Sequence, residues 1–394
     1  MQPTSVSSAS NKGLLLDQRL HHPIGELNGD DGWSGRAEFW RDKVHKQRRS
    51  RFAGAREPLI LSGHGISLRI NRGALEVRNG FTHYPQSREE SRFFPGDWRQ
   101  PPRIVVIDGD GSLTFDVLAW LSEQHIPLIH IDWRGHAKIV AGNGYAAEPE
   151  LVAVQRRVQA DSKRRMDFNR WLITEKFARS RATLVEATPD GDATNAALTE
   201  LARSTREIKA RRAMTVNDLR GIEGRVALAY FRAWRMIPLH WKGTARRPIP
   251  GDWHHVAPRI RPNRTINRRA THPMNAILNY GYAVLESHVR MGIVSTGLDP
   301  TVGMMHMERK DRPAFVLDLM EPLRPAVDAG ALRFVRSNTF SPADFTLGAD
   351  GTCRLHPALA CRVVADIGDV GGIKRLVSDF LNRRHAGTVA TRHV

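Results

Sequence analysis

The sequence predicts an α+β protein in which a small β-rich N-terminal domain is followed by a larger all-α domain. Apolar residues recur at every second position from Pro58 onward, as at Ile66, Leu68 and Ile70, and this is the period of β-strands. After a stretch of Gly and small residues at 141–149, apolar residues recur at helical spacing almost to the end. The chain has 394 residues, of which 41% are hydrophobic, so it is long enough for two domains with a real core.

These patterns divide the chain into four segments. We expect an extension at 1–57, the β-rich domain at 58–145, the helical domain at 146–385 and a frayed tail at 386–394. The extension is rich in Ser, Gly and charged residues, has no sustained period and ends in a basic run. Such a composition cannot bury enough apolar surface to offset the cost of ordering, so we expect the extension to be largely disordered.

The β-rich domain begins with a predicted hairpin. Alternating apolar residues on both sides of an Asn71-Arg72-Gly73 turn give two antiparallel strands between Ile66 and Val77. Further on, the pattern predicts a strand at 104–107, a helix at about 114–124 and strands at 128–131 and 137–140.

The second domain is expected to be helical almost throughout. Its third expected helix, 215–236, begins with Thr215 and Asp218 at the spacing of a capping box. A helical period of apolar residues also runs through Val316, Leu319, Leu323 and Val327. The other expected helices lie at 151–184, 196–212, 272–290 and 373–381.

The charge balance points to a polyanion as partner. The chain has 59 Lys and Arg against 41 Asp and Glu, a formal net charge of +18. Neutralising phosphates with basic side chains releases counterions and gives affinity for nucleic acid without regard to sequence. The segment 243–270 is strongly basic and contains an aromatic residue, which suits contact with a DNA backbone and an unpaired base. The DNA-binding residues predicted here and on the third helix are Arg225, Trp253, Arg259, Arg261, Arg264, Arg268 and Arg269.

No targeting or membrane segment is evident in the sequence. No run approaches 18 consecutive apolar residues, and Leu14–Leu16 is too short for the apolar part of a signal peptide. The two cysteines, Cys353 and Cys361, are not spaced like zinc ligands. We therefore expect no membrane association, reduced thiols and a cytoplasmic location.

Three potential metal ligands lie close together in the sequence. His306 is followed by Asp318 and Glu321, and helical spacing would turn the two acids toward nearly the same side. A carboxylate near the core needs a compensating cation. From this helix alone, a metal shared with His306 and an ordinary ion pair with Arg324 or Arg312 remain equally open.

A second acid stands out on the helix expected at 215–236. Glu223 falls in the middle of an apolar stripe formed by Leu219, Val226, Tyr230 and Trp234, where an apolar residue would be expected. Violations of the binary pattern tend to mark functional positions. This second anomaly favours the metal over the ion pair.

Four ordered motifs make a family resemblance specific. The segments GIEGRVALAYF (221–231), HPMNAILNYGYAVL (272–285), GLDPTVGMMH (297–306) and DLMEPLRPAVD (318–328) resemble the successive signatures of the CRISPR-associated integrase. That family is the metal-dependent endonuclease of the spacer-acquisition complex. The resemblance spans roughly residues 58–385. It departs from the family's pattern at His272-Pro273, where the family usually has Asp-Pro.

The resemblance implies a function and a set of site residues. Glu223, His306 and Glu321 match the family's metal triad, and Asp318 matches an acidic neighbour that assists it, so all four are expected to be catalytic. It also implies that the helical domain is the catalytic one and that the β-rich domain forms a homodimer. A ligand set of two carboxylates and one imidazole suits Mn²⁺ and tolerates Mg²⁺.

The expected reaction joins DNA strands. In the family, 3′-hydroxyls of short captured double-stranded DNA attack phosphodiesters at the borders of a CRISPR repeat, with a small ferredoxin-like partner protein in the complex. Other readings stay open: a related integrase of a mobile element, a nuclease acting on branched DNA, and a non-catalytic DNA-binding protein in which the glutamates only pair with arginines.

Overall fold

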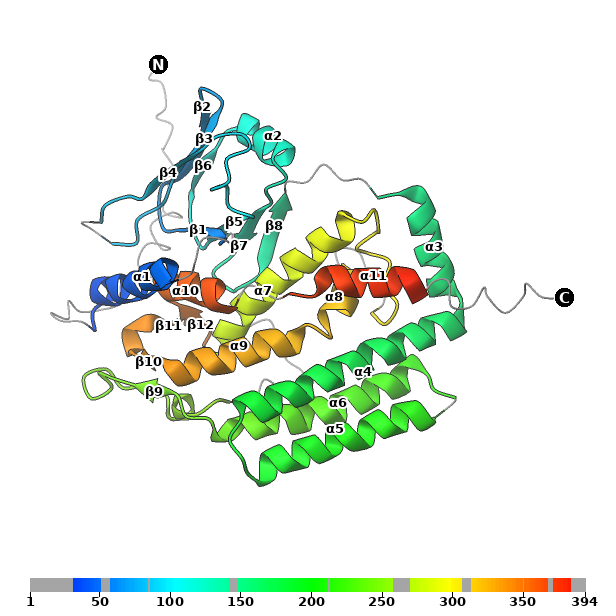
Figure 1. Cartoon of the computed structure of the whole chain (residues 1–394). Coiled ribbons are helices and arrows are strands. Elements are labelled where there is room, and N and C mark those ends of the chain that lie inside the picture. Colours follow the sequence, from blue (N-terminus) through cyan, green and yellow to red (C-terminus); the bar gives the residue numbers. More distant parts are fainter. Residues whose placement is uncertain are drawn as a thin grey trace, which may run out of the picture.

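A computed structural model of the chain describes residues 31–50, 57–83, 86–141, 147–211, 213–257, 270–306, 313–349, 351–367 and 371–383. The helices are α1 (Trp33–Ser50), α2 (Phe115–Glu123), α3 (Pro149–Ala160), α4 (Ser162–Ala187), α5 (Asp192–Ala210), α6 (Val216–Ala233), α7 (Pro273–Val294), α8 (Ala314–Met320), α9 (Arg324–Ser337), α10 (Pro357–Ile367) and α11 (Ile373–Arg383). The strands are β1 (Leu59–Ser62), β2 (Ile66–Asn71), β3 (Ala74–Arg78), β4 (Glu90–Phe93), β5 (Ile104–Ile107), β6 (Gly111–Leu113), β7 (Leu128–Ile131), β8 (Ala137–Ala141), β9 (His240–Trp241), β10 (Thr339–Phe340), β11 (Phe345–Leu347) and β12 (Cys353–Leu355). The predicted α+β class is confirmed: strands dominate the N-terminal part and helices the C-terminal part (Figure 1).

The N-terminal part contains two four-stranded sheets with α2 packed against them. One sheet has the order β4-β3-β2-β6, and the predicted hairpin is its antiparallel β2–β3 pair. The other has the order β1-β5-β7-β8, in which β1, β5 and β7 are parallel and β8 is antiparallel. Buried apolar residues of both sheets and α2 form one core, which includes Leu68, Val77, Ile104, Trp120 and Leu128.

The central strands of this second sheet, β5 and β7, are largely buried on both faces. Ile104 points into the N-terminal core, whereas its neighbours Val105 and Ile107 belong to the core of the helical domain, together with Ile129 and Ile131 of β7. Adjacent side chains of a strand face opposite sides of a sheet, so a continuous apolar strand such as β5 serves two cores. Helices α7 and α10 cover the second face.

The helical domain is organised around α4, α7 and α9. Helix α7 is buried along almost its whole length and packs against α8, α9, α10 and α11. Helix α4 packs against α9 on one side and against α5 and α6 on the other. Helices α4, α5 and α6 lie together at one edge of the molecule (Figure 1). Among the described residues, no helix has the length and apolar character needed to cross a membrane.

Two expected helices are interrupted. The first ends at Ala160 and resumes at Ser162, because Asp161 turns the chain and its side chain caps the N-terminus of α4 by accepting from the amides of Lys163 and Arg164. The second is broken at Glu321–Leu323, between α8 and α9, where Pro325 occupies the first turn of α9.

The expectation of a disordered extension is wrong for Trp33–Ser50, which form α1; the remainder of 1–57, apart from Asp31, Gly32 and Glu57, lies outside the described residues. Helix α1 packs on α10 and is fixed by a buried ion pair. Arg36 donates from Nε and Nη2 to the two carboxylate oxygens of Asp344, both at 2.8 Å, and the Trp40 indole N–H donates to the same carboxylate at 2.9 Å. Arg36 and Asp344 are both fully buried.

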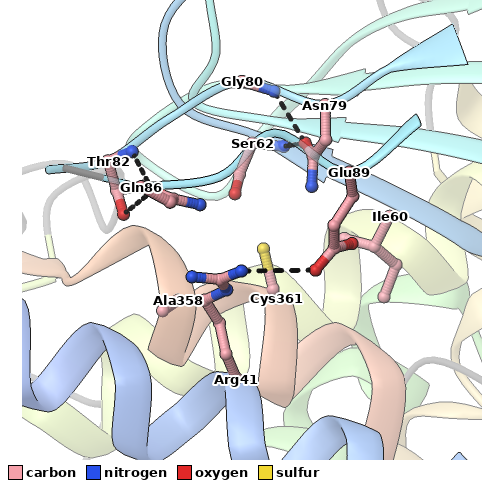
Figure 2. A pocket seen from close by; sticks show the side chains of 10 residues that line it. All are labelled: Arg41, Ile60, Ser62, Asn79, Gly80, Thr82, Gln86, Glu89, Ala358 and Cys361. Atoms are coloured by element: carbon pink, nitrogen blue, oxygen red, sulfur yellow. Dashed lines mark hydrogen bonds and ion pairs between the residues drawn. The ribbon is translucent and has the colours of Figure 1, made fainter. Parts of the chain in front are cut away.

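Helix α1 also contacts the β-rich domain. Figure 2 shows a small cavity of about 60 Å³ where Arg41 of α1 and Cys361 of α10 face Ile60 and Asn79 of the β-rich domain. Across it, the Arg41 guanidinium donates to Glu89 at 3.4 Å. The indole N–H of Trp33 donates to the carbonyl of Thr82 at 3.2 Å. A segment that the sequence pattern left without structure thus bridges the two domains.

Replacing Arg36 by Met should destabilise the protein markedly. It leaves a buried carboxylate without its cation, which costs about 3–5 kcal/mol. Replacing Arg41 by Gln is the matched control, since it breaks a partly exposed ion pair on the same helix that is worth about 1 kcal/mol or less. Thermal unfolding should show a large fall of Tm for R36M and little for R41Q; equal values would contradict this role of α1.

Candidate active site

Three distant segments meet at a cluster of charged side chains. Lys176 lies in the middle of α4, Glu223 in the middle of α6 and Glu321 directly after α8. The Lys176 ammonium donates to Glu223 Oε1 at 2.5 Å and to Glu321 Oε2 at 2.7 Å. One cation therefore bridges two carboxylates that are 98 positions apart in the chain (321 minus 223).

A second cation compensates Glu321. The Arg324 guanidinium pairs with Glu321 Oε1 at 3.2 Å, so each oxygen of this carboxylate has its own positive partner. Burial alone would raise the pKa of Glu321, but the charges of Arg324 and Lys176 outweigh burial and hold that pKa at about 2.

His306 is oriented by Asp318. The fully buried Asp318 carboxylate accepts from the backbone N–H groups of Met304, Met305 and His306, at 2.5, 3.1 and 2.9 Å. Its Oδ1 also lies 2.6 Å from His306 Nδ1. An ionised carboxylate can only accept, so Nδ1 carries a proton; in the neutral imidazole, Nε2 then keeps its lone pair. This is the arrangement in which a carboxylate orients a metal-binding imidazole.

The loop that carries His306 is held by side chains from four elements. The amide of Gln155 on α3 donates to the carbonyls of Asp299 and Val302, and the buried Asn169 on α4 donates to that of Met304. Arg220, one turn before Glu223 on α6, donates to the carbonyl of Met305 at 2.5 Å. Together with Asp318 on α8, these bonds fix the loop relative to both glutamates.

A cavity of about 260 Å³ adjoins the cluster. Lys176, Glu223, Glu321 and Arg324 line one part of it, and the aromatic rings of Tyr230 and Tyr282 line another. Both tyrosine hydroxyls donate to Asp328, which is buried at the same cavity. Burial, followed by the nearby carboxylate of Asp328, raises the pKa of Tyr230 well above its ordinary value, so this hydroxyl stays protonated.

The structure brings the predicted catalytic residues together as two pairs. Glu223 and Glu321 share one cation, and His306 and Asp318 contact each other. Asp318 and Glu321 do not share a patch as expected: Asp318 turns into the His306 loop and Glu321 turns toward α4. Within the described ranges, no three His, Cys, Asp or Glu side chains have come together in a metal-holding geometry.

Of the predicted DNA-binding residues, one is buried, one forms an ion pair and five lie outside the described residues. Trp253 is 4% exposed and its ring packs against Trp241 and Phe345, so the prediction that it stacks on a base is wrong. Arg225 pairs with Glu207 of α5 at 2.6 Å, and its predicted DNA contact would compete with this pair. The remaining five, Arg259, Arg261, Arg264, Arg268 and Arg269, lie outside the described residues.

Sequence reasoning missed several residues of the site. Lys176 is one of many basic residues of α4, and no spacing relates it to either glutamate. The expected Glu321–Arg324 pair is present, but it accompanies the Lys176 contact rather than replacing it. Gln155, Asn169 and Arg220 gave no signal either, since their function depends on a loop that is distant in sequence.

Comparison with known proteins decides the family. The profile described as "CRISPR associated protein Cas1" matches residues 59–367, well over half of the chain. The chain belongs to the Cas1 family. It is 28% identical over 270 residues to CRISPR-associated endonuclease Cas1 1 of Francisella tularensis subsp. novicida, an alignment that covers 68% of this chain and 74% of that protein. The coarse function that follows is that of a nuclease of a CRISPR system.

Solved structures support the same fold. A casposase bound to integration product has a TM-score of 0.67 at 22% identity, covering 86% of this chain and 92% of its own. A Cas1 protein from Thermotoga maritima has a TM-score of 0.61 at 18% identity, covering 86% of this chain and 99% of its own. Helix α1 lies before the residues that the family profile matches.

Replacing Asp318 by Asn should loosen the His306 loop. The Asn amide group would point N–H donors at backbone N–H groups, which leaves buried amides unsatisfied. We expect hydrogen exchange at Met304–His306 to accelerate roughly tenfold or more. Asp299 to Asn is the control, because Asp299 caps an exposed turn of the same loop at Thr301; equal acceleration in both variants would contradict the role given to Asp318.

Glu321 should make stability depend on acidic pH. Its pKa is lowered in the folded state, so its contribution is present above the unfolded pKa of about 4.5 and is lost as pH falls toward about 2. Replacing Glu321 by Gln should flatten the curve of unfolding free energy against pH between these two values. Chemical denaturation of both proteins across this range tests it, and parallel curves would refute it.

Proposed function

We propose that this protein is a divalent-metal-dependent DNA endonuclease and integrase that inserts short captured DNA into a CRISPR array. The 3′-hydroxyls of the captured fragment would attack phosphodiesters of the repeat. The observation that carries the proposal is the convergence of Glu223 and Glu321 on a single cationic point, at 2.5 and 2.7 Å, next to a cavity.

The residues of the site fit a divalent cation. Glu223 Oε1 and Glu321 Oε2 face one point, and neutral His306 would offer Nε2 to the ion, because Asp318 engages the other ring nitrogen. Two carboxylate oxygens and one imidazole nitrogen suit Mn²⁺ and also accommodate Mg²⁺. Bound there, the ion would neutralise charge on the phosphodiester and orient the attacking oxygen.

The protein's own side chains would prepare this site. Asp318 holds His306 in one tautomer and one orientation, so we assign it a positioning role. Arg324 occupies the second oxygen of Glu321 and keeps that carboxylate ionised and directed toward Glu223. The tyrosines on Asp328 form an apolar wall that limits water at one side of the cavity.

Two features support double-stranded DNA as the substrate. The net charge of +18 favours a polyanion. The exposed side of α6 is open at Gly221 and Gly224, where an added side chain would meet no other described element within 4 Å. A phosphate backbone can therefore lie close to this side of the helix. The basic segment that contains Arg259–Arg269 follows the β9 region and remains our predicted contact with the DNA.

The same proposal includes the partners expected for the family. We propose a homodimer formed through the β-rich domain and a small ferredoxin-like protein that joins the integrase in the adaptation complex. An array plasmid and a plasmid carrying terminal inverted repeats, offered in parallel, distinguish this function from that of a mobile-element integrase.

Replacing Glu223 by Gln should abolish strand joining and preserve DNA binding. The assay combines the full chain, a labelled short duplex, a supercoiled array plasmid and Mn²⁺, Mg²⁺ or chelator. We expect a loss of roughly 100-fold or more for E223Q, because a metal ligand is removed. A duplex with blocked 3′ ends separates joining from nicking by water. Full joining by E223Q, or joining in chelator, would show that the glutamates serve only as structural ion pairs.

A further inference from the structure

Lys176 occupies the point at which the two site carboxylates meet. Its ammonium is within hydrogen-bond distance of both glutamates, and its side chain is 15% exposed. No other described cation contacts both carboxylates. The lysine comes from α4, which carries neither glutamate, so its place in the cluster is set by packing of α4 against α6 and α9.

The cluster is electrically balanced without any added ion. Glu223 and Glu321 carry two negative charges, and Lys176 and Arg324 carry two positive ones. Arg324 takes Oε1 of Glu321 and leaves Oε2 to Lys176. Burial would lower the pKa of Lys176, but Glu321 and Glu223 outweigh burial and raise it, so the lysine is charged.

A divalent ion and this ammonium cannot use the same oxygens at once. Metal–oxygen distances for Mg²⁺ are about 2.0–2.1 Å, so an ion bound to both carboxylates would lie where the ammonium now lies. Two positive groups so close together repel strongly in a partly buried site. One of them must leave. Lys176 itself lines the cavity of about 260 Å³, which gives its flexible side chain a place to go.

We propose that Lys176 is a displaceable counterion of the site. In the metal-free protein it holds Glu223 and Glu321 together; on metal binding its ammonium moves into the cavity, where it can pair with a phosphate oxygen of the DNA. Lys176 thus stabilises the metal-free protein and weakens the affinity for the ion. This inference rests on the proposed function, since it presumes that the two glutamates bind a divalent ion.

The test compares metal binding by the full chain and by K176M, which keeps the length of the side chain and removes its charge. Calorimetry with MnCl₂ at one pH gives the affinity, and thermal unfolding in chelator and in Mn²⁺ gives the stability. We expect K176M to bind Mn²⁺ about tenfold or more tightly than the wild type. We also expect it to have a lower Tm in chelator and a larger rise of Tm with Mn²⁺.

Controls separate this inference from the proposed function. K163M removes a charge from the exposed start of the same helix and should behave like the wild type. If K176M does not fold, K176Q replaces it. Equal or weaker Mn²⁺ affinity of the Lys176 variant, with the wild type binding the ion, would overturn the inference alone. Absence of Mn²⁺ binding in both proteins would overturn the metal site of the proposed function and the inference with it.

Discussion

The compensation of the Glu223 and Glu321 carboxylates, by the Lys176 ammonium that bridges them and by Arg324, is the constraint on which the arrangement of the helical domain depends. Unpaired charges of this kind are costly away from water, so Glu223 and Glu321 are stable only where α4 delivers Lys176 between them. That requirement fixes α4 against α6 on one side and against α9 on the other. The same contacts therefore determine both the packing of the helices and the positions of the site residues. These contacts exist before any ligand binds.

The His306 loop shows how an irregular segment can be as fixed as a helix. A buried loop must find partners for its backbone groups, and here the partners are side chains of the surrounding helices. Gln155, Asn169 and Arg220 bind its carbonyls, and Asp318 binds its amides. These four come from four different helices, so the loop cannot shift relative to one helix without losing bonds to the others. Such support holds the His306 imidazole at a defined place.

The sequence predicts those elements and site residues whose evidence lies in residues that are neighbours in the sequence. The β2–β3 hairpin follows from alternation around one turn, and Glu223 is conspicuous because it interrupts an apolar stripe. Lys176 is not predictable in this way, since its partners lie 47 and 145 positions away and a basic residue on a helix is usually solvated. Helix α1 could not be predicted for the same reason. Arginine is usually a surface residue, and Arg36 is buried only because it pairs with Asp344, which is distant in the sequence. For Trp253 the local signal is misleading. It is an aromatic residue in a basic segment, but its ring packs inside the fold.

Helix α7 connects the β-rich domain to the cavity beside the charged cluster through four consecutive residues. Asn279 and Tyr280 donate to the carbonyls of Arg134 and Trp133 in the turn before β8, while Tyr282 donates to Asp328 at the cavity. Two glycines allow close packing around these residues. A side chain at Gly135 would meet Asn279 at 2.8 Å, and one at Gly281 would meet Val327 of α9 at 2.7 Å. The loop before β8 and helix α9 thus pack against the same part of α7. The β-rich domain and the cavity at Asp328 are therefore joined through one short stretch of α7.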